Sequence, residues 1–273
     1  MSECYSEKFI FNEYIKDNSE FDEKNLYIGK SLYEVIRIVK GVPLFLEDHL
    51  KRLYKSAKAT GLEIWMQKEE IQKNIRELSK VNNVENGNVK IVFNYNEDIE
   101  TFLCYFLKAS YPSEEMYDKG VKTSLYHAER QNPTAKVINI SLREATNKII
   151  KETGVYEVIL VNRDGYITEG SRSNIFMIKD YKVYTAPIQE VLPGITRDYI
   201  IKACINLGYD VIEERINYKD IEKLQGLFIS GTSPKVLPIS RVGNINFDCK
   251  NKIIMEIMNE YDKILEEYIN RNR

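Results

Sequence analysis

Histidine is scarce in this chain, with only His49 and His127 among 273 residues. A histidine-rich metal site or a Ser-His-Asp triad therefore has little material from which to be built. The four cysteines stand far apart and form no CxxC pair, at Cys4, Cys104, Cys204 and Cys249. We therefore expect free thiols in a reducing cytoplasm, and no resident metal ion.

Long apolar runs and an excess of one charge are also missing. No apolar run is long enough to span a bilayer, and the polar segment Met1–Lys8 lacks the apolar stretch of a secretory signal. The net charge is only -2, so bulk electrostatics gives no reason to expect nucleic acid as a partner. With 43% hydrophobic and 29% charged residues, the composition predicts a soluble globular protein.

The apolar pattern predicts two domains. The first half predicts a strand over 33–39, helices over 48–60 and 67–80, and strands over 89–95 and 102–107. Segment 109–120 contains Pro112 and has no clear periodicity, and we interpret it as the link between domains. The predicted domains are a small one over 1–112 and a large one over 113–273.

The second half mixes strands and helices without strict βαβ alternation, which predicts an α+β fold with much antiparallel sheet. Strands are expected near 122–126, 157–162, 173–178, 182–185, 210–214 and 227–230, and helices near 142–153, from 196, and over 252–269. Thr196 is a good helix N-cap. The residues of its helix expected to face inward are Ile200, Ile201, Cys204 and Ile205.

Lys136 lies between apolar residues, after a turn that contains proline, in Asn132-Pro-Thr-Ala-Lys-Val-Ile-Asn139. Removal of an amine from water favours its neutral, nucleophilic form, which can react with an aldehyde. A solvated lysine near a strand end is the alternative.

Glu169 follows an apolar strand and precedes a Gly/Ser turn. A carboxylate that faces a pyridine nitrogen keeps this nitrogen protonated, and the protonated ring accepts electrons from a substrate carbanion. An ordinary turn acid at the end of a hairpin is the alternative.

Two turns of small residues could bind phosphate. Gly194-Ile-Thr-Arg197 opens a helix, whose free amides form an anion site together with the Thr196 hydroxyl. Gly231-Thr-Ser233 follows an apolar strand and offers further donors. Simple helix capping by Thr196 is the alternative.

One lysine, one acid and two such turns together predict a site for pyridoxal 5′-phosphate (PLP).

Two arginines are further candidates. Arg52 lies outside the apolar stripe of its helix, and its planar guanidinium suits a phosphate, with an ordinary solvated helix face as the alternative. Arg37 shares a strand face with Tyr33 and Val35, where an arginine usually binds an anion or lies at a sheet edge.

On these residues the chain resembles the fold-type IV PLP enzymes of class IV: branched-chain aminotransferases, D-amino-acid aminotransferases and aminodeoxychorismate lyases. The resemblance covers about residues 8–245, and the order and spacing of its motifs make it specific. The motifs are Tyr33-Glu-Val-Ile-Arg37, Asp48-His-Leu-Lys-Arg52, Lys136 with Asn139, Tyr156-Glu-Val-Ile-Leu160, Thr168-Glu-Gly-Ser-Arg-Ser-Asn-Ile-Phe176, Leu192-Pro-Gly-Ile-Thr-Arg197 and Gly231-Thr232. The resemblance implies a two-domain α+β fold, with a smaller N-terminal α/β domain and a larger C-terminal domain that has a β-barrel-like core.

The resemblance also implies that Lys136 is the Schiff-base lysine and proton carrier, and that Glu169 pairs with the pyridine nitrogen. The other implied cofactor contacts are Arg52, Ser171, Arg172, Ser173, Asn174, Ile195, Thr196 and Thr232. The implied substrate pocket contains Tyr33, Arg37 and Ser233. Because the family is typically homodimeric, a homodimer is implied here as well.

The chain departs from the family's pattern at three places. Gly29-Lys30-Ser31 replaces Gly-Asp-Gly before the first strand, and Ile140 and Ser141 occupy the region where branched-chain members carry a tyrosine. No arginine stands near the end of Lys90–Asn96, where aminotransferases of the family place one. The candidate cations for a substrate carboxylate are Arg37, Arg172 and Lys235.

We therefore predict a PLP-dependent aminotransferase that acts on an amino acid and a 2-oxo acid. The resemblance favours branched-chain substrates, because Arg37 follows Tyr33 by four residues, as an arginine follows an aromatic residue in the branched-chain members. The main alternative is an aminodeoxychorismate lyase that yields 4-aminobenzoate and pyruvate. The third possible function is that of a PLP-binding scaffold with little turnover.

Overall fold

The computed structural model describes residues 3–97, 99–108 and 110–273, which divide into two compact units. Unit 1 comprises Met1–Ser110, Ala135–Ile138 and Glu267–Arg273, and unit 2 comprises Tyr111–Thr134 and Asn139–Glu266. Lys136 therefore belongs to unit 1, although the chain on both sides of its segment belongs to unit 2. The division at residue 112 into two domains remains a prediction.

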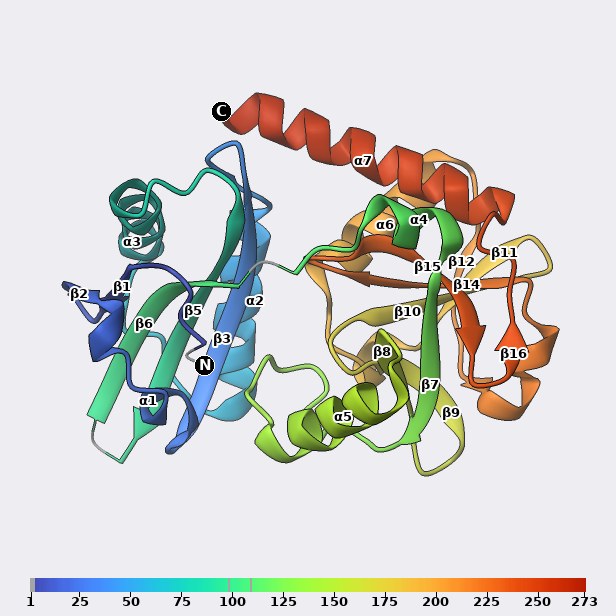
Figure 1. Cartoon of the computed structure of the whole chain (residues 1–273), viewed down its shortest axis with the longest axis horizontal. Coiled ribbons are helices and arrows are strands. Elements are labelled where there is room, and N and C mark those ends of the chain that lie inside the picture. Colours follow the sequence, from blue (N-terminus) through green and yellow to red (C-terminus); the bar gives the residue numbers. More distant parts are fainter. Residues whose placement is uncertain (1–2, 98, 109) are drawn as a thin grey trace. The chain divides into compact units, whose positions relative to one another are not determined.

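Unit 1 is built on a six-stranded antiparallel sheet with the strand order β2-β1-β6-β5-β3-β4 (Figure 1). Its strands are β1 Lys8–Phe11, β2 Tyr14–Asp17, β3 Lys30–Val39, β4 Val42–Pro43, β5 Gly87–Asn96 and β6 Ile99–Leu107. Its helices are η1 Asn18–Glu20, α1 Lys24–Tyr27, α2 Leu46–Thr60 and α3 Lys68–Val81.

Alternation along β3 decides which side chains enter the core of unit 1. Leu32, Ile36 and Ile38 point to one face and pack in a core with the apolar residues of α2 and α3. Tyr33 and Arg37 lie on the other face and are half-buried. One face of the sheet therefore packs against α2 and α3, whereas the face that carries Tyr33 packs against a separate apolar cluster that includes Phe9 and Tyr105.

Unit 2 contains a ten-stranded sheet in which six strands, β10-β14-β15-β7-β8-β9, close into a barrel through the β9–β10 pairing. The strands of unit 2 are β7 Val121–His127, β8 Glu157–Val161, β9 Tyr166–Gly170, β10 Asn174–Lys179, β11 Lys182–Thr185, β12 Val211–Glu213, β13 Ile216–Asn217, β14 Gly226–Gly231, β15 Lys235–Val242 and β16 Ile245–Asn246. The remaining helices are α4 Glu114–Lys119, α5 Ile140–Thr153, η2 Ile188–Glu190, α6 Ile195–Asn206, η3 Tyr218–Lys223 and α7 Lys252–Asn272. The prediction of an α+β fold with a barrel-like core is confirmed.

The segment interpreted as the link between domains contains α4, which Ser113 caps through a 3.2 Å bond from the Met116 amide; residue 109 lies outside the described residues. Two local predictions were wrong. Thr196 is not the N-cap of its helix, because Gly194 takes this position. Ile205 is 64% exposed and does not face inward. Within the described part of the chain, no helix combines the length and the hydrophobicity that a membrane span needs.

Candidate active site

Lys136 lies in a short extended segment that pairs with the edge of β3. The Tyr33 amide donates to the Lys136 carbonyl oxygen at 3.2 Å, and the Ile138 amide donates to Ser31 O at 3.1 Å. The Lys136 amide donates to the Ser56 hydroxyl of α2 at 3.2 Å. The backbone of Lys136 is thus fixed by both a strand and a helix, and its Nζ lies 4.7 Å from the centroid of the Tyr33 ring.

A buried charged cluster lies under α2, next to this segment. Glu34 is fully buried, and its Oε1 accepts from Arg52 Nε at 2.8 Å while its Oε2 accepts from Arg52 Nη2 at 2.5 Å. His49 Nδ1 lies 2.8 Å from Glu34 Oε2. Arg52 is only 6% exposed, so the alternative of an ordinary solvated helix face is wrong for this residue.

The cluster shifts the pKa of both titratable members. Burial opposes ionisation of Glu34, but the charge and hydrogen bonds of Arg52, helped by His49, outweigh burial and lower the pKa of Glu34 to about 2. Burial lowers the pKa of His49, although Glu34 acts in the opposite direction. His49 is therefore neutral near pH 7 and donates its Nδ1 proton to Glu34.

In unit 2, Glu169 on β9 is a buried carboxylate with two partners. Its Oε1 accepts from Arg130 Nε at 2.8 Å, and its Oε2 accepts from the Leu192 amide at 3.1 Å. Glu169 pairs across the strands with Asn174, whose Nδ2 donates to Leu192 O at 2.9 Å. Glu169 lies at the end of the β9–β10 hairpin, as the alternative reading expected, but it is only 2% exposed.

The segment that holds Glu169 leads directly into α6. Gly194 is the N-cap, and the first bond of the helix runs from the Asp198 amide to Gly194 O at 3.0 Å. The amides of residues 195–197 therefore have no partner within the helix. A Cβ on Gly194 would lie 2.1 Å from Asn174 Oδ1, so this approach requires glycine. The Leu192 amide, which binds the buried carboxylate of Glu169, is thus only three residues before the first residue of this helix.

The turn Ser171–Ser173 folds around Glu157, a buried residue of β8. The Ser171 hydroxyl donates to Glu157 at 3.2 Å, the Ser173 hydroxyl at 2.8 Å and the Arg172 amide at 2.5 Å. Burial raises the pKa of Glu157, and these hydrogen bonds offset part of this effect. The contacts predicted between this turn and a cofactor stay predictions.

The remaining predicted residues lie in several places. Thr232 and Ser233 form the turn between β14 and β15, and Ser230 before them is buried with a hydroxyl that has no partner among the described residues. Arg172 Nη2 bonds the Asn147 side chain, and Lys235 pairs with Asp262 at 2.7 Å. Unit 1 carries Tyr33, Arg37, Arg52 and Lys136, and unit 2 carries Glu169, Ser171, Arg172, Ser173, Asn174, Ile195, Thr196, Thr232 and Ser233. The roles assigned to them stay predictions.

Sequence reasoning did not single out Glu34, Arg130 or Glu157. A signal for Glu34 was present, because it is in phase with Leu32 and Ile36 on the buried face of an alternating strand. The pairing of Arg130 with a carboxylate 39 positions away had no local signal.

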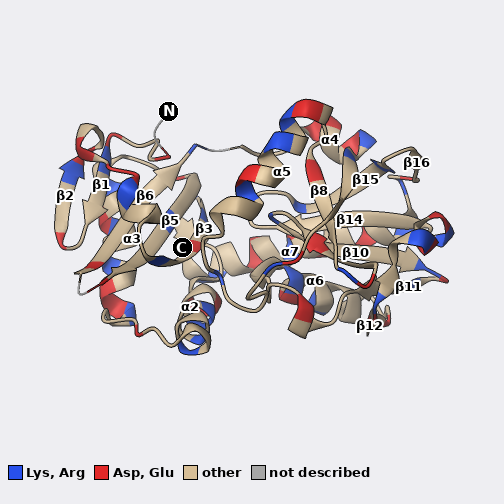
Figure 2. Cartoon of the chain, turned by 90° about the horizontal axis from the view of Figure 1, so that it is seen from below, with Lys and Arg blue, Asp and Glu red and all other residues tan. Residues whose placement is uncertain are grey.

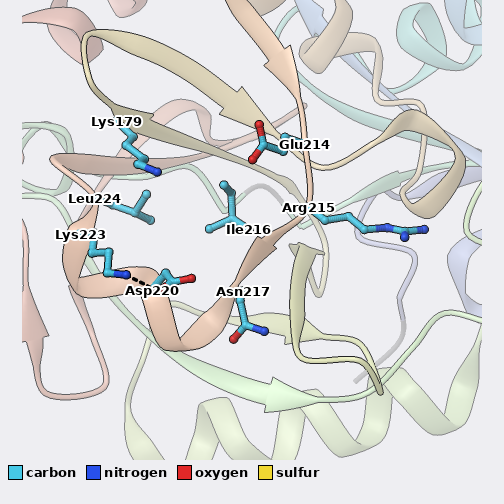
Figure 3. A pocket seen from close by; sticks show the side chains of 8 residues that line it. All are labelled: Lys179, Glu214, Arg215, Ile216, Asn217, Asp220, Lys223 and Leu224. Carbon is cyan, nitrogen blue, oxygen red and sulfur yellow. Dashed lines mark hydrogen bonds and ion pairs between the residues drawn. The ribbon is translucent and has the colours of Figure 1, made fainter.

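A small cavity of about 130 Å³ in unit 2 contains none of the predicted residues (Figure 3). It is lined by Lys179, Glu214, Arg215, Ile216, Asn217, Asp220, Lys223 and Leu224. Lys223 already pairs with Asp220 at 2.7 Å, so part of its charge is neutralised. Among the residues that the structure describes, no group of three His, Cys, Asp or Glu side chains is placed to hold a metal ion.

Comparison with known proteins identifies relatives along most of the chain. The family model described as Amino-transferase class IV matches residues 31–242. A protein of Methanocaldococcus jannaschii, provisionally named a branched-chain-amino-acid aminotransferase, is 31% identical over 238 residues, 82% of this chain and 82% of the relative. A D-alanine aminotransferase of Bacillus licheniformis is 25% identical over 263 residues, 86% of this chain and 88% of the relative.

A solved structure shares the fold. The branched-chain aminotransferase from Thermoproteus uzoniensis, determined with norvaline, superimposes with a TM-score of 0.85 and 23% identity, and the match covers 97% of this chain and 98% of the other.

Proposed function

Because the chain belongs to the class IV aminotransferase family, we propose that it is a PLP-dependent aminotransferase that moves an amino group between an amino acid and a 2-oxo acid. The name of the relative from M. jannaschii and the spacing of Tyr33 and Arg37 support substrates of the branched-chain type. A homodimer in the cytoplasm remains part of this proposal.

The observation that carries the proposal is the arrangement around Leu192. A pyridine ring that bears a phosphate needs an acceptor for its ring N–H and several donors for its phosphate. Unit 2 supplies both, since the Leu192 amide holds Glu169, and the helix that begins at Ile195 presents free amides. The unpartnered Ser230 hydroxyl is a further open donor. The donor set of the chain therefore fits PLP.

The candidate residues would have distinct tasks. When bound, PLP supplies an aldehyde for the amino group and a ring that accepts electrons. Glu169 would accept a hydrogen bond from the ring nitrogen, and the bond from Arg130 Nε helps to hold its carboxylate in place. The amides of Ile195 and Thr196 would bind phosphate oxygens.

Lys136 would hold the cofactor covalently through Nζ. The Nζ of Lys136 would also accept the proton of the substrate α-carbon as a base and return it as an acid. The fixed backbone of Lys136 limits the positions that this amine can reach.

Covalent mapping tests the proposal. Protein loaded with PLP is reduced with sodium borohydride and digested, and mass spectrometry locates the added mass. We expect it on Lys136, and we expect Lys136→Ala to lose both the mass and amino transfer. Lys148→Ala is the matched control, since the Lys148 side chain on α5 is 75% exposed. An adduct confined to other lysines, or none, would contradict the proposal.

A donor screen with the loaded enzyme then assigns the reaction. L-leucine, L-glutamate and D-alanine are each offered with 2-oxoglutarate or pyruvate as acceptor. We expect transfer from L-leucine; transfer from D-alanine alone would reassign the substrate. Release of pyruvate from aminodeoxychorismate without any acceptor would instead identify the lyase.

A further inference from the structure

Lys90 is a lysine in the middle of the unit 1 sheet that is only 1% exposed. Lysine is almost never fully buried unless it is paired. Lys90 lies on β5 opposite Val35 of β3 and Tyr105 of β6, on the sheet face that also carries Tyr33. The Lys90 side chain is therefore held on the side of the sheet that α2 does not cover.

The partner of Lys90 is a carboxylate from a distant segment. Both oxygens of Glu3 lie 3.0 Å from Lys90 Nζ, and the Tyr105 hydroxyl donates to Glu3 Oε2 at 3.0 Å. The segment is attached along the edge of β6 by a bond of 2.8 Å from the Tyr5 amide to Phe106 O. Two side chains of the sheet, Lys90 and Tyr105, thus bind the Glu3 carboxylate in the way that they would bind the carboxylate of a free ligand.

This carboxylate site lies close to Lys136. The centroid of the Tyr33 ring is 5.1 Å from Lys90 Nζ and 4.7 Å from Lys136 Nζ, so the two ammonium groups are at most about 10 Å apart. In an amino acid or 2-oxo acid the first carboxylate carbon is one bond, about 1.5 Å, from the reacting carbon, and the second of a dicarboxylate is only a few bonds further. A substrate that reacts at Lys136 can therefore reach Lys90.

We propose that Lys90 and Tyr105 form, beside Tyr33, a carboxylate-binding subsite for the substrate, and that Glu3 occupies this subsite in the free protein and competes with the substrate carboxylate. The proposal rests on the proposed function, since this function makes Lys136 the reacting amine. In this subsite Lys90 would be the cation for the substrate carboxylate. The chain has no arginine near the end of β5, where other aminotransferases of the family place one.

The exchange of carboxylates keeps every buried donor paired. An incoming carboxylate takes over the bonds of Glu3 to Lys90 and Tyr105, so no buried charge is left alone. The Glu3 side chain is already 17% exposed and can move into water. Burial, reinforced by Glu3, raises the pKa of Tyr105 well above its usual range, so its hydroxyl stays protonated and can donate to either carboxylate.

Three variants of the PLP-loaded protein test the proposal, with 2-oxoglutarate as the acceptor. Glu3→Gln removes the competitor, and we expect the KM for 2-oxoglutarate to fall by about tenfold, the scale of one charge-assisted hydrogen bond, with kcat unchanged. Lys90→Met, and Tyr105→Phe to a smaller degree, should raise KM. Asp17→Asn is the control, because it breaks the exposed pair of Lys8 and Asp17, whose oxygen and nitrogen lie 2.6 Å apart.

A second measurement needs no turnover. Hydrogen exchange of the Tyr5 amide is followed with and without saturating glutarate, and we expect the dicarboxylate to speed exchange, because displacement of Glu3 loosens the segment. If Lys90→Met fails to fold, the double variant Glu3→Gln/Lys90→Met is used in its place, because it removes both charges and leaves neither one unpaired.

An unchanged KM in Glu3→Gln together with unchanged exchange would make the contact a purely structural ion pair and overturn the inference. A protein that takes up no PLP at Lys136 would overturn the proposed function instead, and the exchange measurement would still decide the carboxylate subsite.

Discussion

At the scale of single residues, the chain buries carboxylates in two different ways. Glu34 is neutralised by the guanidinium of Arg52, whereas Glu157 is held by two hydroxyls and one amide. Removal of one member of a buried ion pair leaves the other charge without compensation. Substitution of Glu34 should therefore reveal how strongly unit 1 depends on this pair.

We expect Glu34→Gln to lower the free energy of unfolding by about 3–5 kcal/mol, because Arg52 stays buried without a counter-charge. Urea unfolding followed by Trp65 fluorescence measures this effect, since Trp65 packs on Phe93 in the same unit. Glu77→Gln, at an exposed site of α3, is the control and should stay within about 0.5 kcal/mol of the wild type. Equal stability of the two variants would show that the ion pair contributes nothing.

The same cluster predicts a dependence of stability on pH. The pKa of Glu34 is about 2 in the folded protein and 4.5 as its ordinary value, so its contribution is complete above pH 4.5 and is lost as pH falls towards 2. The lowered pKa of His49 adds a loss that begins below its ordinary value of 6.5. Urea midpoints at a series of pH values should fall below pH 6.5 and more steeply below 4.5. The second decline should be smaller in Glu34→Gln, and a curve parallel to that of the wild type would refute the assignment to Glu34.

At the scale of elements, the β9–β10 connection is the part of unit 2 that orders most of the candidate site. Glu169 ends one strand and Asn174 begins the next, and the turn between them wraps around Glu157. Gly170 is the first residue after Glu169. A Cβ added to Gly170 would lie 2.2 Å from Ser173 Oγ and 2.8 Å from Glu157 Oε1. Only a glycine allows the turn to close this tightly.

Gly170→Ala should therefore destabilise the protein by about 1–3 kcal/mol, through overpacking, and weaken PLP binding. The double variant Gly170→Ala/Ser173→Ala removes the closest clash and should recover part of the PLP affinity, measured by equilibrium dialysis. Gly87→Ala is a milder control, because its nearest atoms are side-chain carbons at 3.2 Å. A single variant that binds PLP as the wild type does would show that this turn has no bearing on the cofactor.

At the scale of the whole molecule, the chain has hydrophobic cores in both units and a mixed distribution of charge. Lys and Arg are interspersed with Asp and Glu over both units (Figure 2), in line with a net charge of -2. The cores also enclose most of the thiols, since Cys4, Cys104 and Cys204 are buried and Cys249 is partly exposed. Thiol reactivity is thus a measure of global folding.

We expect a thiol reagent such as DTNB to label Cys249 alone in the native protein and all four cysteines in urea. Burial raises the pKa of Cys204 to about 12 and the pKa of Cys4 and Cys104 above their usual range, which suppresses the reactive thiolate. Peptide mapping identifies the labelled residue, and Cys249→Ser should abolish the native signal. Rapid native labelling of Cys104 would contradict the buried core.

The sequence by itself determined the family, the order of its motifs and the α+β class, because these depend on local patterns. Alternating apolar residues predicted β3, and helical spacing predicted α2 and α3, since both periods are properties of a single segment. Lys136 and Glu169 could be selected because a lysine between apolar residues and an acid before a Gly/Ser turn are visible in a few neighbouring residues.

Only the tertiary structure decided which charges meet. Arg130 reaches Glu169, Arg52 reaches Glu34 and Glu3 reaches Lys90 across separations of 39, 18 and 87 positions. Sheet register and helix packing set these contacts, and neither is encoded in a local pattern. For the same reason the sequence could not show that Lys136 is attached to β3 in unit 1, because this assignment depends on pairing between segments that are a hundred residues apart.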